Sequence, residues 1–157
     1  MKLTLHVSGE PVAQPRPKAR AFMVGPNKAR AQIYDPGGAS QWKALIRAAA
    51  AKHLPPEPLR GPIKITATFF FPRPASHFNK SGLTKAAPRK HIQRPDFDNC
   101  IKAVTDALTD ARLWHDDAMI DEAHIRKHWA QKNPGVVIEI ESEEQQPDLT
   151  LADAAKE

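Results

Sequence analysis

The sequence predicts a single α+β domain in which a small mixed β-sheet packs against two main helices. Short segments in which apolar and polar residues alternate indicate half-buried strands, and two longer segments with apolar residues at helical spacing indicate the helices. A chain of 157 residues is long enough for one domain with a sizeable core. We expect this domain to occupy residues 1–141, followed by an acidic C-terminal tail at residues 142–157.

The composition excludes several classes of protein. No apolar run approaches the length needed to span a membrane, and the N-terminal residues are too polar for a secretory signal. Cys100 is the only cysteine, which excludes an internal disulfide framework and fits a reducing compartment. We therefore expect a cytoplasmic protein.

Charge is distributed unevenly along the chain. The formal net charge is +5, but residues 1–95 carry 17 Lys and Arg against three acidic residues, whereas residues 96–157 carry 15 acidic residues against six Lys and Arg. This asymmetry indicates a basic half that holds a polyanion and an acidic half that holds a metal ion. The alternative is a soluble chain with uneven surface charge.

The chain begins with a predicted strand and a basic loop. Leu3, Leu5 and Val7 alternate with polar residues, which predicts a half-buried strand at residues 2–8. The prolines of the following segment, residues 11–38, exclude a helix or a central strand, and we expect an extended loop. A loop of this length without a periodic pattern is typical of a binding loop, and a solvated connection is the alternative.

A helix and the clearest strand of the chain follow. Ser40 is a suitable N-cap for a helix at residues 41–54, which two prolines end. Its predicted buried face consists of Trp42, Leu45, Ile46, Ala49 and Leu54. Residues 63–71 alternate apolar and polar without interruption, and we assign their phenylalanines to the core rather than to a platform for stacking bases.

Residues 72–94 are predicted to be irregular and to contact the phosphates of a nucleic acid. The segment contains no acidic residue and six cations, Arg73, Lys80, Lys85, Arg89, Lys90 and Arg94. Such a run is typical of a flap that contacts phosphates. The alternative is a disordered, solvated loop, which could also become ordered only on nucleic acid. Taken with the earlier loop, the predicted DNA-binding residues are Arg16, Lys18, Arg20, Lys80, Lys85, Arg89, Lys90 and Arg94.

The central helix is predicted at residues 96–112, with Asp96 as its N-cap. Its buried face should consist of Cys100, Ile101, Val104, Ala107, Leu108 and Ala111, and its polar stripe of Asp98, Lys102, Thr105, Asp106 and Thr109. The carboxylates of Asp96 and Asp98 repel one another unless protons or cations compensate them, and a hard divalent cation with oxygen ligands would do so. The alternative is that both serve the helix dipole and that Asp98 and Lys102 form an ordinary surface pair.

A second acidic pair, Asp116 and Asp117, follows the apolar anchor Trp114 beyond this helix. Residues 119–129 and 136–140 have strand patterns separated by a turn, which predicts a hairpin. If the first residues of this hairpin fold beside the start of the central helix, Asp116 or Asp117 lies next to Asp96 and Asp98.

Other metal sites and nucleophiles are weaker interpretations. The spacing of Asp96 and Asp98 fits the start of an EF-hand loop, but the required glycine and glutamate do not follow. His124 and His128 would lie about 13 Å apart on a strand, which disfavours a zinc site. Cys100 falls on the buried face of the helix, which disfavours a nucleophilic role.

The motifs that carry chemistry lie at a specific spacing. They are Arg-Pro-Asp-Phe-Asp-Asn at residues 94–99, Lys102, Asp-Ala-Leu at residues 106–108 and Trp-His-Asp-Asp at residues 114–117. This set resembles the signature of the RusA family of Holliday-junction resolvases, small bacterial and phage endonucleases. The Gln-Pro-Arg-Pro of residues 14–17 and His91 are similar to longer members, and the resemblance covers most of residues 3–141. One departure is that a glycine is expected before the tryptophan, where this chain has Arg112 and Leu113.

The resemblance implies a RusA-like fold and a Mg²⁺-dependent endonuclease, with Mn²⁺ as a substitute metal, that resolves four-way DNA junctions in recombination and repair. It implies that Asp96, Asp98 and Asp117 bind the metal, that Asp116 assists, and that Lys102 is catalytic. It also implies a bacterial or phage-encoded homodimer. Such a dimer fits a four-way junction, because its two-fold axis supplies two equivalent sites for two symmetric nicks.

Two other functions are compatible with the sequence. One is a non-catalytic DNA-binding module whose carboxylates only cap a helix, and the other is a metal-dependent hydrolase of small nucleotides. The basic segments argue against the small substrate, because a mononucleotide needs few cations. Divalent-dependent nicking of a synthetic junction separates the three functions.

Overall fold

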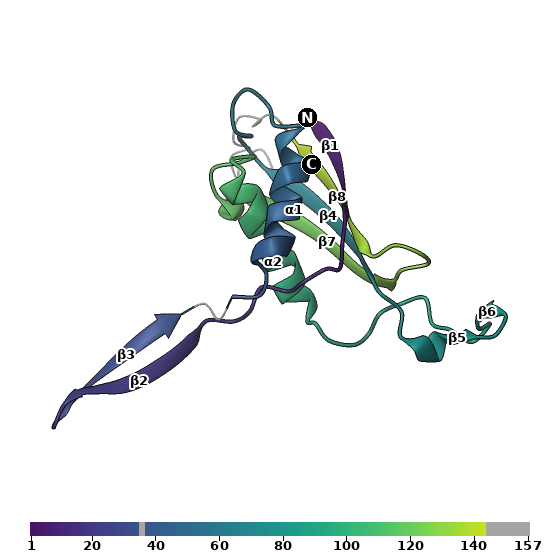
Figure 1. Ribbon diagram of the computed structural model, residues 1–157. Helices are drawn as coiled ribbons and strands as arrows, with labels where there is room; N and C mark the ends of the chain where they lie inside the picture. The colour runs from purple at the N-terminus through teal and green to yellow at the C-terminus, as the bar shows by residue number, and fades with distance from the viewer. Residues whose placement is uncertain (35–36, 144–157) are drawn as a thin grey trace, which may run out of the picture.

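A four-stranded sheet with two helices on one of its faces forms the body of the molecule (Figure 1). The computed structural model describes residues 1–34 and 37–143, so residues 144–157 of the predicted tail lie outside the described residues. The strand order is β1-β8-β4-β7, with β4 and β7 parallel and the other neighbours antiparallel. The mixed sheet and the two helices confirm the predicted α+β class.

The body consists of β1 (Lys2–Ser8), α1 (Ser40–Ala51), β4 (Ile63–Phe71), α2 (Phe97–Asp110), β7 (Ile120–Trp129) and β8 (Gly135–Ser142). Two hairpins lie outside this sheet, β2 (Lys18–Gly25) with β3 (Lys28–Tyr34), and β5 (Phe78–Asn79) with β6 (Gly82–Leu83). Two 3-10 turns, η1 (Ala75–His77) and η2 (Asp117–Met119), precede β5 and β7. No helix within residues 1–34 and 37–143 is long and apolar enough to cross a membrane.

The predicted hairpin of β7 and β8 is wrong, because β4 lies between these two strands. Every residue of β4 is buried or half-buried, which suits a central strand, whereas half of the residues of β7 are exposed, which suits an edge. Parallel strands need a long crossover connection, and α2 provides it between β4 and β7. The link at residues 130–134 then passes the end of β4, where the Ala130 N–H donates to the Phe71 carbonyl at 2.8 Å.

The core lies between the sheet and the two helices. The strand at residues 63–71 is confirmed in full, and its alternate side chains are buried. These side chains are Ile63, Ile65, Ala67, Phe69 and Phe71. The phenylalanines at positions 69 and 71 are core residues, as predicted, whereas Phe70 is half-buried on the opposite face of the sheet.

The first helix differs from its prediction in its cap and in its buried face. Ser40 is the first helical residue and not the N-cap, and the residue before it makes no side-chain cap. The helix ends at Ala51 and buries a narrow stripe at four-residue spacing, Trp42, Ile46 and Ala50. Leu45 and Leu54 are exposed, because the first lies beside this stripe and the second lies beyond the helix.

α2 ends two residues before the predicted residue 112, in a Schellman motif. The Leu113 N–H donates to the Leu108 carbonyl at 3.1 Å, and the Arg112 N–H donates to the Thr109 carbonyl at 2.9 Å. Arg112 has a φ of 60°, the left-handed conformation that glycine adopts without strain and that costs other residues about 1–2 kcal/mol. Arg112 stands where a glycine was expected, and it adopts the same left-handed turn that a glycine would make.

The basic segment after β1 is not the predicted irregular loop. Residues 18–34 form the β2–β3 hairpin, which projects away from the body (Figure 1). Cross-strand partners share a face, so one face carries Lys18, Arg20, Phe22, Arg30, Gln32 and Tyr34, and the other carries Ala19, Ala21, Met23, Ala29, Ala31 and Ile33. The prolines do not oppose the strands, because they lie before β2 and in the turn at residues 26–27.

The segment at residues 72–94 is mostly irregular, as predicted, but it is attached to the body. The Arg73 guanidinium donates to the carbonyls of Ala130 at 2.9 Å and Pro88 at 2.8 Å, so this cation holds the fold and is not available to phosphates. Residues 89–91 pair with the edge of β7, through the His91 N–H to the Lys127 carbonyl at 3.0 Å. These contacts cover part of an edge strand that would otherwise be open.

Gly135, the first residue of β8, is required by the close approach of β1. A Cβ at this position would lie 2.4 Å from the backbone oxygen of Val7. We expect Gly135→Ala to lower the free energy of unfolding by about 1–3 kcal/mol, because two paired strands would have to move apart. Urea unfolding measures this change. Gly25→Ala is the matched control, since nothing lies within 4 Å of a Cβ there, and equal effects of the two substitutions would contradict the steric explanation.

Candidate active site

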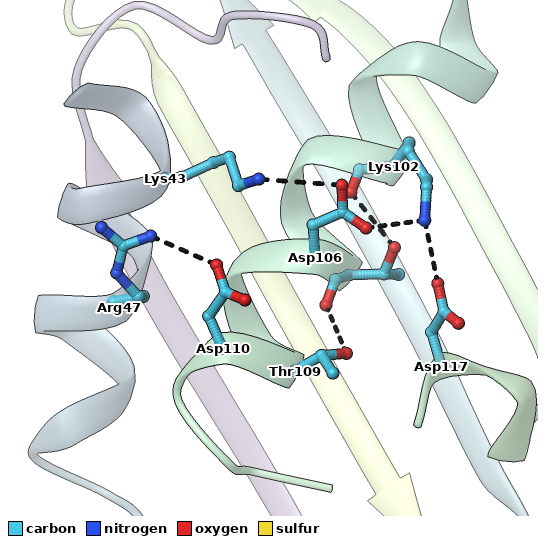
Figure 2. A network of polar contacts seen from close by, with 8 residues as sticks. Lys43, Arg47, Lys102, Asp106, Thr109, Asp110 and Asp117 are labelled. Carbon is cyan, nitrogen blue, oxygen red and sulfur yellow. Dashed lines mark hydrogen bonds and ion pairs between the residues drawn. The ribbon is translucent and has the colours of Figure 1, made fainter. Parts of the chain in front are cut away.

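One exposed side of α2 carries charged residues at four-residue spacing, Asp98, Lys102, Asp106 and Asp110. Residues four apart lie above one another on a helix, so these side chains form a single stripe. Each carboxylate of the stripe pairs with a cation, and in every case at least one of its partners comes from another element. Figure 2 shows the lower part of this stripe, with α1 on one side and Asp117 on the other.

Lys102 lies at the centre of the stripe, between two carboxylates. Its Nζ is 2.6 Å from Asp106 Oδ1 and 3.3 Å from Asp117 Oδ2 (Figure 2). The pKa of Lys102 is raised above its usual value, first of all by the hydrogen bond with Asp106, which outweighs the opposite effect of burial, and further by the charge of Asp106 and by Asp117. The ammonium group is therefore held in its charged form at neutral pH, at a point where side chains from α2 and η2 converge.

α1 supplies cations to the far end of the stripe. Lys43 Nζ lies 3.7 Å from Asp106 Oδ2, and Arg47 Nη1 lies 3.5 Å from Asp110 Oδ2 (Figure 2). The Lys43 and Asp106 side chains are 19% and 24% exposed, so this pair is better shielded from solvent than the others of the stripe. Asp106 is thus held by two lysines from two helices.

The start of α2 carries the first carboxylate pair. Asp96 occupies the N-cap position but its side chain makes no capping hydrogen bond, so its carboxylate is not used by the helix. The proline-rich segment before β2 is fixed against this helix end by the Gln14 N–H, which donates to the Asn99 carbonyl at 2.8 Å. As a result Arg16 reaches Asp98 at 3.5 Å, and a predicted DNA-binding cation meets a predicted metal ligand.

Trp114 positions the second carboxylate pair. Its side chain is buried, and its Nε1–H donates to Thr109 Oγ1 at 2.7 Å. The Thr109 hydroxyl in turn donates to the carbonyl of Thr105. Thr105 was predicted on the exposed polar stripe, but it is buried. With the tryptophan fixed, the chain continues into η2, where Asp116 accepts from the Ala118 N–H at 2.7 Å and Asp117 turns towards Lys102.

The structure places the two acidic pairs in different clefts. Asp96 and Asp98 line a cleft of about 610 Å³ at the start of α2. Asp116 and Asp117 line a cleft of about 280 Å³ together with Lys102. Within residues 1–34 and 37–143, no group of three or more His, Cys, Asp or Glu is placed to hold a metal ion.

The donors are nevertheless of the right kind for a hard divalent cation. Carboxylate oxygens are the ligands that Mg²⁺ prefers, and Asp98 and Asp117 are turned towards protein cations at 3.5 and 3.3 Å. The side chains of these two ion pairs are between 40% and 74% exposed. Exposed ion pairs contribute at most about 1 kcal/mol to the free energy of unfolding. Loss of these two ion pairs would therefore not disturb the core.

The competing sites weaken further in the structure. His124 and His128 belong to the same strand, and His124 is within 2.6 Å of Glu122, which already pairs with Lys64. Cys100 is buried, and burial first of all raises the pKa of its thiol to about 11, so it is not a nucleophile at neutral pH.

The sequence did not assign three residues that the structure brings to the site. Asp106 was predicted on the polar stripe, but its contact with Lys102 could have been read from their four-residue spacing. Lys43 gave no signal, because its contact depends on how α1 packs against α2. Lys127, on β7, donates to the carbonyls of Gln93 and Pro95 and so fixes the chain before Asp96.

The predicted DNA-binding cations are exposed, and most are free of acidic partners. Arg16 pairs with Asp98. Within the described part of the chain, no ion pair involves Lys18, Arg20, Lys80, Lys85, Arg89, Lys90 or Arg94. Unpaired exposed cations contribute little to folding, so they are available to a polyanion.

Comparison with known proteins identifies a family that this sequence matches. The sequence model of the family described as endodeoxyribonuclease RusA matches residues 8–141. The chain is also similar to the uncharacterized protein YqaN of Bacillus subtilis (strain 168), with 26% identity over 129 residues, which cover 80% of this chain and 87% of that protein. The match to the family includes both acidic pairs and both basic segments.

Proposed function

Because the chain belongs to the RusA family of endodeoxyribonucleases, which act on Holliday junctions, we propose that it resolves four-way DNA junctions by paired symmetric nicks that depend on Mg²⁺. The single observation that supports this proposal best is the position of Lys102. Its charged ammonium lies between carboxylates of α2 and η2, on the exposed stripe that Asp98 begins.

The metal would be held by Asp96, Asp98 and Asp117, with the assistance of Asp116, and Mn²⁺ would substitute for Mg²⁺. A divalent cation bound there would polarise the scissile phosphate and lower the pKa of an attacking water. Asp96 supports this assignment, because its carboxylate makes no capping bond. Asp98 and Asp117 support it because their present partners, Arg16 and Lys102, are cations whose side chains are more than half exposed.

Lys102 would act on the phosphate itself. An ammonium that is fixed and charged before the reaction can stabilise negative charge as it develops on the phosphate oxygens. The raised pKa of Lys102 keeps it protonated at neutral pH, as this role requires. The first N–H groups of α2, which the Asp96 side chain leaves unused, can bind a phosphate oxygen nearby.

Two basic segments would hold the arms of the junction. The β2–β3 hairpin presents Lys18, Arg20 and Arg30 on one face, and residues 80–90 present further exposed cations. These segments support a polymeric substrate over a mononucleotide, which needs few cations. A homodimer with two-fold symmetry would present both catalytic sites to the two strands that must be cut.

The direct experiment is nicking of a synthetic four-way junction with and without divalent cations. We expect paired nicks in Mg²⁺ or Mn²⁺, none with a chelator, and little cutting of an unbranched duplex of the same sequence. Binding of the junction without any metal-dependent cutting would instead identify a non-catalytic DNA-binding module. Hydrolysis of nucleotides in place of junctions would identify the small-substrate enzyme.

The second basic segment can be tested through the salt dependence of binding. Each lost phosphate contact should flatten the plot of log affinity against log salt by about 0.9 for duplex arms. We expect this for combined alanine substitutions of Lys80, Lys85, Arg89 and Lys90, measured in Ca²⁺ to suppress cutting. Affinity for different sequences should fall together, because phosphate contacts carry no sequence information.

The control for that experiment is Lys2→Ala, which removes a cation that pairs with Glu141 on the sheet, away from both basic segments. An unchanged slope in the quadruple variant would show that residues 80–90 do not touch DNA. A loss confined to some sequences, with little change in slope, would show that they read bases instead.

A further inference from the structure

Two large apolar side chains are exposed beside the first carboxylate pair. Ile92 is 91% exposed and Phe97 is 60% exposed, and both line the cleft of about 610 Å³ that Asp96 and Asp98 also line. Single exposed apolar residues are common, but two in one cleft next to charged groups indicate a binding surface.

The exposure of these side chains is not the result of a loosely held chain. The preceding residue, His91, is buried and stacks on Phe71 at a centroid distance of 4.2 Å, with Trp129 4.3 Å away. On the other side, Lys127 donates to the carbonyls of Gln93 and Pro95. The backbone that carries Ile92 is therefore held at both ends, and the cleft exists before any ligand binds.

The cleft combines an aromatic face with a cation and a side-chain amide. Arg94 and Gln93 line it, together with Lys127, whose ammonium already donates to the carbonyls of Gln93 and Pro95. Proteins that hold unpaired nucleotides use aromatic side chains for stacking and cations for the backbone, while side-chain amides can bond the edge of a base. Asp96 and Asp98 also line the cleft, so their carboxylates favour an uncharged base within it over an anionic group.

We propose that this cleft receives one nucleobase that is unstacked at the branch point of the DNA, with Phe97 stacking on its face and Ile92 packing at its edge. Phe97 stands between Asp96 and Asp98 in the chain, so a base held there brings its own phosphate to the carboxylates. The proposal rests on the proposed function, because it names the part of the junction that the same site would recognise.

A nucleobase fits the cleft better than a second copy of the chain does. A stable protein interface buries about 1,200–2,000 Å² in total, far more than two side chains can supply. The surroundings are also charged, with Arg94, Lys127 and two aspartates, whereas the core of an interface between copies is depleted of charge.

The experiment uses tryptophan fluorescence. The three native tryptophans, Trp42, Trp114 and Trp129, are 2%, 1% and 7% exposed, so a Trp at position 97 would emit as an exposed indole against a buried background. Phe97→Trp is titrated with a four-way junction, an unbranched duplex and a single strand, in Ca²⁺ to suppress cutting. Leu54→Trp is the matched control, because Leu54 is 39% exposed and lies outside the cleft and both basic segments.

We expect the junction to quench the exposed emission of Phe97→Trp and to shield it from acrylamide, while the duplex and the control variant show neither effect. Unchanged emission at saturating junction, with saturation established by gel shift, would overturn the nucleobase site and leave the proposed function standing. If the protein binds the junction no better than the duplex, the proposed function fails. In that case the single strand tests the nucleobase site by itself: quenching of Phe97→Trp by the single strand supports the site, and unchanged emission overturns it. If the emission of Phe97→Trp is shielded from acrylamide even without DNA, and the molecular mass of the protein rises at the same protein concentration, the cleft is covered by a second copy of the chain. That result would overturn the proposal.

Affinity provides an independent measurement. Phe97→Ala should weaken junction binding about tenfold, as expected for the loss of one stacked base, and should leave duplex binding unchanged. Leu54→Ala should change neither. Equal loss on junction and duplex would contradict the proposal, because a base in an intact duplex is not available for stacking.

Discussion

Asp117→Asn should abolish nicking of a four-way junction in Mg²⁺, with a loss of at least about 100-fold in rate, while the junction binds with equal or higher affinity. The same result is expected for Asp96→Asn and Asp98→Asn. An amide keeps the shape of the side chain but removes the charge that holds a divalent cation. Without a divalent cation, removing negative charge near the phosphate cannot weaken its electrostatic attraction to the protein. Single-turnover nicking in Mg²⁺ and binding in the presence of a chelator measure the two effects separately.

Asp110→Asn is the control for this series, because Asp110 lies on the same stripe and lines the cleft of Asp117, but pairs with Arg47 and is not among the proposed metal ligands. It should nick at close to the wild-type rate. A substitution among the three ligands that does the same would remove that aspartate from the site. Loss of folding in Asp96→Asn, seen by urea unfolding, would revive the capping role, which the missing side-chain cap argues against.

Lys102→Ala should lower the nicking rate about 100-fold and change junction affinity by no more than a few-fold. The ammonium would interact most strongly with charge that exists only in the transition state, so its loss appears in the rate and not in binding. Lys102→Arg should rescue only in part, since a guanidinium is larger and its charge is delocalised.

Arg47→Ala is the matched control for Lys102, because it removes a cation that serves the neighbouring carboxylate on the same stripe. A Lys102→Ala variant that loses affinity and keeps its rate would identify the lysine as a phosphate clamp. The pKa of Lys102 is raised in the folded protein, so its charge is complete below its ordinary range and is lost only as the pH rises above that range. Nicking between pH 6 and 9 should therefore show no titration of this group.

The strands that were predicted correctly are those in which buried and exposed side chains alternate along the segment itself. β1, β4 and β8 alternate because one of their faces is buried under the helices, and this pattern is visible in the sequence. The partner of each strand is not visible there. A short turn joins β7 to β8, yet β4 lies between them in the sheet. Pairing depends on which strand can take a neighbouring strand on each of its two edges, and this is decided by the whole sheet.

The β2–β3 hairpin was missed for the opposite reason. All residues of its two strands except Gly25 are exposed, so burial imposes no alternation of apolar and polar residues on them. The site shows the same division. Charges on one helix, such as Lys102 and Asp106, follow from four-residue spacing, whereas the contacts of Lys43 and Arg47 depend on the packing of α1 against α2. The exposure of Phe97 could not be inferred from a motif in which it stands between two aspartates.

The projecting hairpin has a consequence for how such a protein can change over generations. It shares no strand pairing with the four-stranded sheet and buries none of its side chains in the core. Substitutions in residues 18–34 should therefore leave the packing of the sheet unchanged. On the proposed function, the hairpin can then vary in length and charge to suit DNA of a different shape while the charged stripe on α2 stays as it is.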